Sequence, residues 1–326
     1  MYKMSKTETP LDERAPDVFQ SEKRERLKEF KSSMLNIVKS RRNFKDFLFH
    51  IILGIGIIII IMPFFLVLYQ VASVGFGELF SNGFDSFSNF FLTEPGRGLM
   101  GGIRNAFFGT IFLIILASAV GIPLSVFGAV YINEYTRPGR IRDMVEFTSD
   151  VLAGIPSIVF GAFGFAFLVG FLGLGMGLLS GSLTLAFMMI PTVLRTTQEA
   201  LRAVPMSLRE ASLALGATKW STTWNVTMRA AFPGVITGVL LAIGRVMGET
   251  APLIFTSGNS LTTPTEIVGP GSWVASMPYT IWSYITDPRQ YLNIKAHATA
   301  VALMTMVLAI DIVANIISRK VTRRLV

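Results

Sequence analysis

The residues best suited to chemistry lie in an otherwise apolar stretch, LAIGRVMGETAPL, at residues 241–253. This stretch carries a guanidinium, Arg245, and a carboxylate, Glu249, four residues and therefore about one helical turn apart. A second arginine, Arg195, lies in another apolar stretch. A guanidinium is always charged and offers a fork of donors to the oxygens of an anion. The types and spacing of these charged residues favour recognition of an anion. Whether this takes place inside a membrane depends on the segments that carry them.

The elements that carry these charges are predicted to cross a membrane. Only 15% of the residues are charged, against roughly 25% in soluble proteins. Three stretches carry no Asp, Glu, Lys or Arg: 47–77 (31 residues), 105–133 (29 residues) and 151–194 (44 residues). About 20 apolar residues suffice to cross a bilayer core. The pattern predicts an all-α polytopic protein with a glycine-rich hairpin at 170–182 and six spans, at 47–72, 105–133, 151–172, 180–200, 234–257 and 297–318.

The distribution of Lys and Arg predicts the orientation. Twelve lie in the first 46 residues, three in 134–148, four in 201–233 and four after the last span. The intervening loops at 73–104, 170–182 and 258–296 hold two, none and two Lys or Arg residues. Positive residues collect on the cytoplasmic side, so both termini are expected there. These flanks also account for the net charge of +8 without a nucleic-acid partner. The expected domains are a cytoplasmic tail, 1–46, and a six-span domain, 47–326. Within the tail, 20–42 fits either a helix on the membrane surface or a solvated segment.

The sequence lacks the residues that several kinds of chemistry require. The chain has no cysteine and no GxxxxGK[ST] stretch, so neither a cysteine-ligated metal nor a P-loop nucleotide site is expected. His50 and His297 are its two histidines, and they are far apart in the sequence, which does not fit a metal site. No catalytic set is apparent. The sequence therefore favours a transport subunit or a scaffold over an enzyme.

The basic loop at 201–233 predicts a partner on the cytoplasmic side. Residues 205–234 fit two short helices, with Ser207 and Glu210 as a capping box at the start of the first. Gly216 is placed to end that helix in a left-handed conformation. The small side chains of Ala211 and Ser212 suit a helix that enters a partner's groove. The alternative is an ordinary connector between two spans.

This loop resembles the EAA loop of ABC importer permeases, through Glu210-Ala211-Ser212, Leu215 and Gly216. The family pattern continues with Leu-Pro where this chain has Met228-Arg229, so the resemblance is weaker for the second helix, and Pro233 is the alternative break. In that family the loop enters a cleft of the ATPase subunit and transmits its closure to the spans.

Three further stretches resemble the permeases of the phosphate-specific ABC importer, the PstA-type subunit more than the PstC-type: GIPSIVFG (154–161), IPTVLRTTQEALRAVP (190–205) and GRVMGETAPLIFT (244–256). The resemblance implies the type I ABC importer permease fold and a prokaryotic inner membrane. It implies a PstC-like partner, two ATPase subunits that bind ATP and Mg, and an extracytoplasmic phosphate-binding protein. This chain itself is expected to bind no cofactor. Alternatives are a permease for another oxyanion or small solute, and a non-conducting scaffold that docks an ATPase.

The charges within the predicted spans are candidates for the substrate pathway, because a charge near the bilayer centre is costly. Arg245 lies about twelve residues into the predicted fifth span, near mid-membrane. One interpretation assigns Arg245 and Arg195 to the anion, with Glu249 holding Arg245 and accepting a proton from hydrogen phosphate. The other is a self-neutralising Arg245–Glu249 pair that packs the span, with Arg195 as an inner-boundary anchor. Asp311 is expected at a helix contact. The GxxxG pairs Gly234/Gly238 and Gly244/Gly248 predict close helix packing.

Overall fold

The computed structural model describes residues 26–29, 44–81, 83–269 and 272–325. The chain divides into two units, 1–67 and 68–326. In the first unit, residues 26–29 and the first part of α2 (Phe44–Leu79) are helical. α2 is almost wholly apolar after His50 and contains Pro63. The helix predicted at 20–42 lies outside the described residues except for 26–29.

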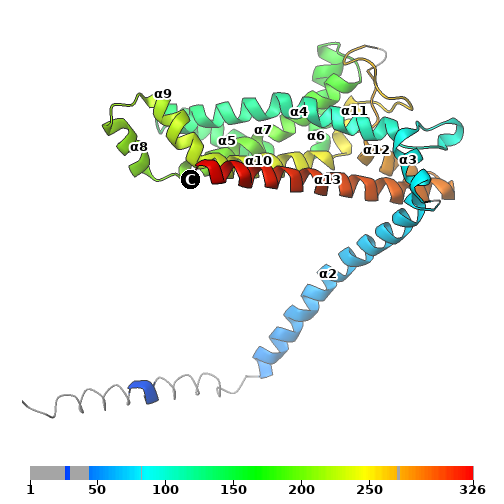
Figure 1. Ribbon diagram of the computed structural model, residues 1–326, viewed down its shortest axis with the longest axis horizontal. Coiled ribbons are helices and arrows are strands. Elements are labelled where there is room, and N and C mark those ends of the chain that lie inside the picture. The colour runs from blue at the N-terminus through cyan, green and yellow to red at the C-terminus, as the bar shows by residue number, and fades with distance from the viewer. Residues whose placement is uncertain (1–25, 30–43, 82, 270–271, 326) are drawn as a thin grey trace, which may run out of the picture. The chain divides into compact units, whose positions relative to one another are not determined.

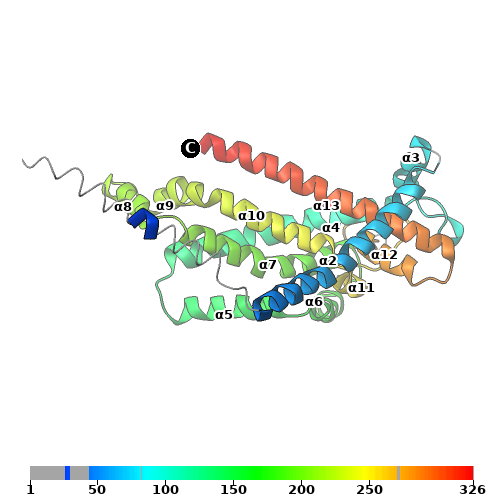
Figure 2. The ribbon, with the colours of Figure 1, turned by 90° about the horizontal axis from the view of Figure 1, so that it is seen from below.

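The second unit is built around four long helices that run side by side: α4 (Arg104–Val130), α7 (Leu178–Arg202), α10 (Met228–Met247) and α13 (Gln290–Leu325) (Figures 1 and 2). At one end of this bundle lie α8 (Met206–Ala214) and α9 (Lys219–Thr222) (Figure 1). At the other end lie α3 (Phe84–Leu92), the 3₁₀ turn η1 (Arg97–Leu99) and α12 (Met277–Ile285). The remaining short helices pack beside α7: α5 (Arg140–Gly154), α6 (Ser157–Gly164) and α11 (Ala251–Thr256).

Five helices are long and apolar enough to cross a membrane, and a sixth span is counted if one bent pair is a single span. The bent pair, Arg140–Gly154 and Ser157–Phe171, begins eleven residues before the predicted third span (151–172), and it is broken by 102° between Gly154 and Ser157. Pro156 explains the break, because a proline disfavours helical geometry at the residue before it. Beyond α6 the helix widens into the π-helical segment η3 (Phe165–Phe171). Gly173 and Gly175 then adopt positive φ before α7 begins, which confirms the glycine hairpin.

The predicted bounds of the fifth span are wrong. A continuous helical stretch runs from Lys219 to Met247 through α9, the π-helical segment η4 (Thr223–Thr227) and α10. The second helix predicted within the 205–234 loop is therefore the beginning of this span, and Pro233 lies inside α10 instead of ending a helix. The stretch ends at Gly248, and the GETAPL residues continue as the separate helix α11.

α7 is the central helix of the second unit. In its most apolar window 67% of the residues are buried, against 17–33% in the spans formed by α4, α10 and α13. Glycines let α10 approach α7 closely: a Cβ at Gly234 would lie 2.7 Å from Ala200 Cβ, and one at Gly238 would lie 2.5 Å from Thr196 Cβ. The predicted packing role of this glycine pair is confirmed.

The other glycine pair does not make close contacts. A Cβ at Gly244 would find Asp311 Oδ1 at 4.0 Å as its nearest neighbour, and Gly248 forms the C-cap of α10. Close packing through Gly244 and Gly248 was therefore a wrong prediction. The same contact places Asp311 of α13 against α10, at the helix interface where it was expected.

The ends of α8 differ in how well the sequence predicted them. The helix begins at Met206 after Pro205 and has no side-chain cap, so the Ser207–Glu210 capping box is wrong. Its far end was predicted correctly, because Gly216 has φ +85°, a conformation that costs other residues steric strain.

Candidate functional site

Two of the three stretches that resemble phosphate-importer permeases, 154–161 and 244–256, come together in space. α11 packs against α6, and a Cβ at Gly161 of GIPSIVFG would lie 2.7 Å from Pro252 Cα of GETAPL. One turn further along α6, a Cβ at Gly164 would meet Thr184 of α7 at 2.3 Å and Thr256 of α11 at 3.0 Å. Backbones at this junction therefore approach one another without room for an added side chain.

Two interrupted helices meet the middle of α7 at this junction. α5 ends close to it, since Ser149 Oγ donates to Pro191 O at 3.4 Å. The break between α10 and α11 reaches the same depth. α10 runs antiparallel to α7, with Gly238 opposite Thr196, and Arg245 lies seven residues, or about 10 Å, further along. Interrupted backbone at membrane depth is tolerated where it is buried in protein or lines a water-filled cavity.

Arg245 donates no hydrogen bond to any residue that the structure describes. Its Nε lies 4.0 Å from Glu249 Oε1, which is beyond hydrogen-bond distance. The Arg245 side chain is 45% exposed and the Glu249 side chain 17%. The carboxylate is therefore close enough to attract the guanidinium without occupying its donors. The two residues are brought together as expected, and their role in a pathway stays a prediction.

Arg195 has a different environment. Its guanidinium pairs with Asp150 of α5, and its Nε lies 3.1 Å from Glu199 Oε1 on α7 itself. Two carboxylates outweigh one guanidinium, so an anion would meet net negative charge beside Arg195. The Glu199 contact has the i,i+4 spacing that sequence can reveal. The Asp150 contact joins residues 45 positions apart, and no local pattern indicates it.

At the α8 end, the predicted coupling residues are largely available to a partner. Glu210, Ala211 and Gly216 are exposed, and Leu215 is 89% exposed. Ser212 differs, because its hydroxyl lies 2.9 Å from the Thr222 hydroxyl of α9. A partly buried ion pair between Arg209 of α8 and Glu134 was not anticipated from the sequence. No group of three or more His, Asp or Glu residues within the described ranges could hold a metal ion.

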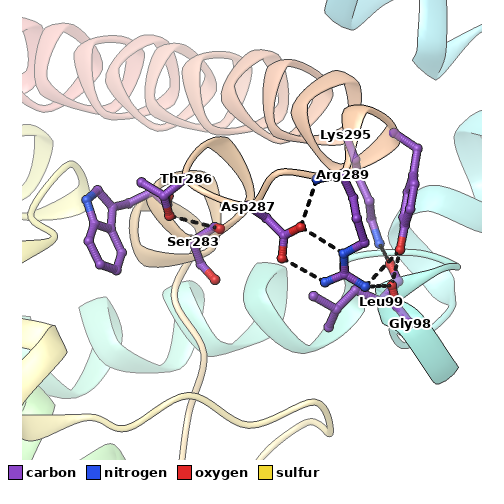
Figure 3. Close-up of polar contacts among 9 residues, drawn as sticks. Gly98, Leu99, Ser283, Thr286, Asp287, Arg289 and Lys295 are labelled. Carbon is purple, nitrogen blue, oxygen red and sulfur yellow. Dashed lines mark hydrogen bonds and ion pairs between the residues drawn. The ribbon is translucent and has the colours of Figure 1, made fainter.

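At the opposite end, a network of polar contacts fixes the loop between α3 and α4 (Figure 3). Arg289 donates to both carboxylate oxygens of Asp287 at 2.7 Å and to Gly98 O at 3.1 Å. Lys295 Nζ donates to Leu99 O at 2.8 Å. Gly98 and Leu99 both have positive φ, a strained conformation for leucine. The Arg289 guanidinium lowers the pKa of Asp287 to about 2.

A second set of contacts joins this loop to the chain after α11. Glu94 Oε1 accepts hydrogen bonds from the Thr263 backbone N–H at 2.9 Å and from its hydroxyl at 3.0 Å. Asn105 Nδ2 donates to Ser260 O at 2.6 Å. These hydrogen bonds hold the two loops together, and Trp273 in the second loop and Trp282 on α12 are both exposed.

This arrangement is the fold of an ABC transporter's membrane subunit. The chain aligns over 86% of its length with 99% of a chain from a bacterial alginate ABC transporter, solved in complex with an alginate pentasaccharide-bound periplasmic protein (TM-score 0.61, 18% identity). Residues 121–325 match the family described as binding-protein-dependent transport system inner membrane component. The chain belongs to this family and is a multi-pass membrane protein.

Relatives of the chain are phosphate transport system permease proteins named PstA. The protein from Yersinia pestis is 36% identical over 229 residues, which is 70% of this chain and 76% of the relative. The protein from Mycobacterium leprae is 33% identical over 299 residues, which is 90% of this chain and 95% of the relative. The resemblance expected from the motifs and the type I fold are both confirmed.

Proposed function

We propose that this chain is a permease subunit of an ATP-driven importer for inorganic phosphate, in which it forms half of the pathway. The observation that carries the proposal is the junction of α6 and α11 on α7, where two phosphate-permease motifs, 154–161 and 244–256, meet at interrupted helices, and the second motif carries Arg245. The names of the relatives support the choice of substrate.

Within the pathway, Arg245 is the residue that attracts phosphate. Its donors are not consumed by Glu249, so the carboxylate holds the guanidinium in place and can accept a proton from hydrogen phosphate. Arg195 belongs to the inner part of the pathway. Because Asp150 and Glu199 neutralise it, its contribution is to position helices rather than to make the first contact with the anion.

The complex contains partners that supply what this chain lacks. Two ATPase subunits bind ATP and Mg, since the chain has no P-loop sequence. They receive Glu210, Ala211, Leu215 and Gly216, which are exposed, with Ser212 holding α8 against α9. A PstC-like subunit completes the pathway, and an extracytoplasmic phosphate-binding protein docks on the joined outer loops. Both termini lie in the cytoplasm, and the 1–46 tail precedes the permease domain, 47–326.

Phosphate uptake by the reconstituted complex tests this proposal. Arg245→Gln should abolish uptake while co-purification with the partner subunits is retained. Arg195→Gln is the control, because a neutralised arginine should reduce uptake less. Uptake that persists in Arg245→Gln, or a complex that no longer assembles, would contradict the assignment of Arg245.

Two further measurements address the alternatives. Competition by sulfate or molybdate as effective as by unlabelled phosphate would favour a permease for another oxyanion. Absence of uptake by the unaltered complex, together with intact ATPase binding, would favour a scaffold.

A further inference from the structure

The coupling helix α8 has little apolar contact with the rest of the chain. None of its nine residues is buried, and its Met206, Leu208 and Leu213 side chains are all exposed. Burial of apolar surface is the usual source of rigidity between packed helices. α8 therefore needs another means of attachment if its movement is to reach the spans.

Two polar side chains supply that attachment. Among the residues of α8, only Arg209 and Ser212 are not exposed. They are three positions apart and therefore share one face of the helix. Ser212 contacts Thr222, which lies on the helical stretch that continues into α10. Arg209 reaches the ends of α4 and α7 instead.

Arg209 makes four polar contacts with those ends. Its Nη2 donates to Glu134 Oε1 at 2.9 Å, and its Nε to Glu134 Oε2 at 3.4 Å. Its guanidinium also donates to Leu201 O at 2.8 Å and to Val204 O at 2.7 Å. Glu134 belongs to η2 (Tyr131–Tyr135), the π-helical continuation of α4. Leu201 and Val204 lie at the end of α7 and are buried in a cluster with Val130 of α4.

The geometry of the Arg209–Glu134 contact restricts the movement of the two side chains relative to each other. The side chains of Arg209 and Glu134 are 12% and 9% exposed, so water screens their attraction little. Two donors of one planar guanidinium meet two oxygens of one carboxylate, which fixes orientation as well as distance. A lysine would supply the charge without this fork.

From these contacts we infer that the Arg209–Glu134 pair is a positioning element that carries the displacement of α8 to α4 and α7. The inference rests on the proposed function, because it assumes that an ATPase moves α8. Ser212 and Thr222 form the parallel connection to α10. ATP-driven movement would then reach the central helix α7 and the helix that bears Arg245 through separate polar contacts.

Substituting both residues of the pair distinguishes a loss of coupling between ATP hydrolysis and transport from a loss of complex stability. Either single change, Arg209→Met or Glu134→Gln, leaves one charge buried without its partner and is expected to weaken the assembled complex. The double variant, Arg209→Met with Glu134→Gln, leaves no unpaired charge. It should therefore assemble and hydrolyse ATP, while the phosphate imported per ATP hydrolysed falls by about tenfold, as for typical coupling between sites. Arg142→Met is the matched control, because its ion pair with Glu146 lies within α5 alone, and it should leave the ratio unchanged.

A distance measurement tests the inference without relying on transport. The chain has no native cysteine, so spin labels can be placed by Met206→Cys on α8 and Tyr131→Cys on η2, both exposed. On ATP binding, the distance between the labels should stay constant in the otherwise unaltered complex and should change in the double variant.

The outcomes that contradict the inference differ from those that contradict the proposed function. A double variant with an unchanged import-to-hydrolysis ratio would overturn the inference, as would a label distance that changes in a complex with the native pair. If the double variant does not assemble, the test is the label distance in the complex with the native pair. A constant distance on ATP binding supports the inference, and a changed distance contradicts it. Failure of the proposed function would appear instead as an unaltered complex that imports no phosphate.

Discussion

Replacing Gly238 by alanine would place a methyl group where α10 has no room for one. The new Cβ would lie 2.5 Å from Thr196 Cβ and 2.0 Å from Thr196 Oγ1. The hydroxyl could rotate away, but the Cβ of Thr196 is fixed to the backbone of α7. Ordinary contact begins at 3.4 Å, so the two helices would have to separate by about 0.9 Å, the difference between 3.4 and 2.5 Å.

The expected loss of stability follows from two opposing terms. Overpacking costs about 1–3 kcal/mol, and the upper end applies because the clash involves a fixed atom. Alanine regains about 0.5–1 kcal/mol over glycine within a helix. The net loss is about 2 kcal/mol, which corresponds to a fall in Tm of roughly 4–8 °C at about 2–4 °C per kcal/mol.

Thermal unfolding of the purified chain in one detergent measures this effect. Gly128→Ala is the matched control: it lies in α4, and its added Cβ would meet Leu194 Cδ1 at an ordinary 3.6 Å. Thr196→Gly should partly rescue Gly238→Ala, because contacting sites are not additive. If Gly238→Ala unfolds at or above the Tm of Gly128→Ala, the close approach of α7 and α10 is refuted.

Three further predictions concern a helix end, a helix junction and a loop. Gly216→Ala should weaken binding of the ATPase in a pull-down, because φ +85° costs alanine about 1–2 kcal/mol; Gly216→Asn should be milder, and equal binding by all three chains would contradict this. Gly161→Ala should lower phosphate uptake more than Gly170→Ala, because only the first Cβ would meet backbone closer than 3.0 Å; equal uptake would refute the junction of α6 and α11. The folded pKa of Asp287, about 2, lies below its ordinary value of 3.8, so its stabilising contact is complete above pH 3.8 and is lost as the pH falls through about 2. Carboxyl ¹³C NMR should report that low pKa and a value near 4 in Arg289→Gln; a midpoint near 4 in the unaltered chain would contradict the Asp287–Arg289 contact.

The sequence predicted features that depend on local composition. Uncharged apolar stretches located the helices, because a lipid-facing segment must be apolar along its length. The turn at 173–175 and the left-handed end of α8 were predicted because glycine alone adopts positive φ without steric cost. The packing of Gly234 and Gly238 was predicted because small residues at a spacing of four form one flat helix face.

Features that depend on contacts between distant residues were not predicted. For Arg195 the sequence left both an anion contact and an inner-boundary anchor open, and its pairing with Asp150 depends on how α5 lies against α7. Pairing of Arg209 with Glu134 joins positions 75 residues apart. The end of α10 was misplaced by ten residues, at 257 instead of 247, because apolar residues resume at 251–255 after the break and hydropathy does not register a change of helix direction.

The central position of α7 has a consequence for how the chain enters the membrane during synthesis. Because neighbouring helices shield most of α7 from lipid, its sequence was never required to be strongly apolar, and it is the least apolar of the five span candidates. It also carries Arg195, Glu199 and Arg202, and each charge raises the free energy of partitioning into lipid. α7 alone would therefore partition poorly at the translocation machinery. Its integration depends on α4, which is synthesised earlier and packs along it, so biogenesis of this protein is cooperative between spans rather than sequential.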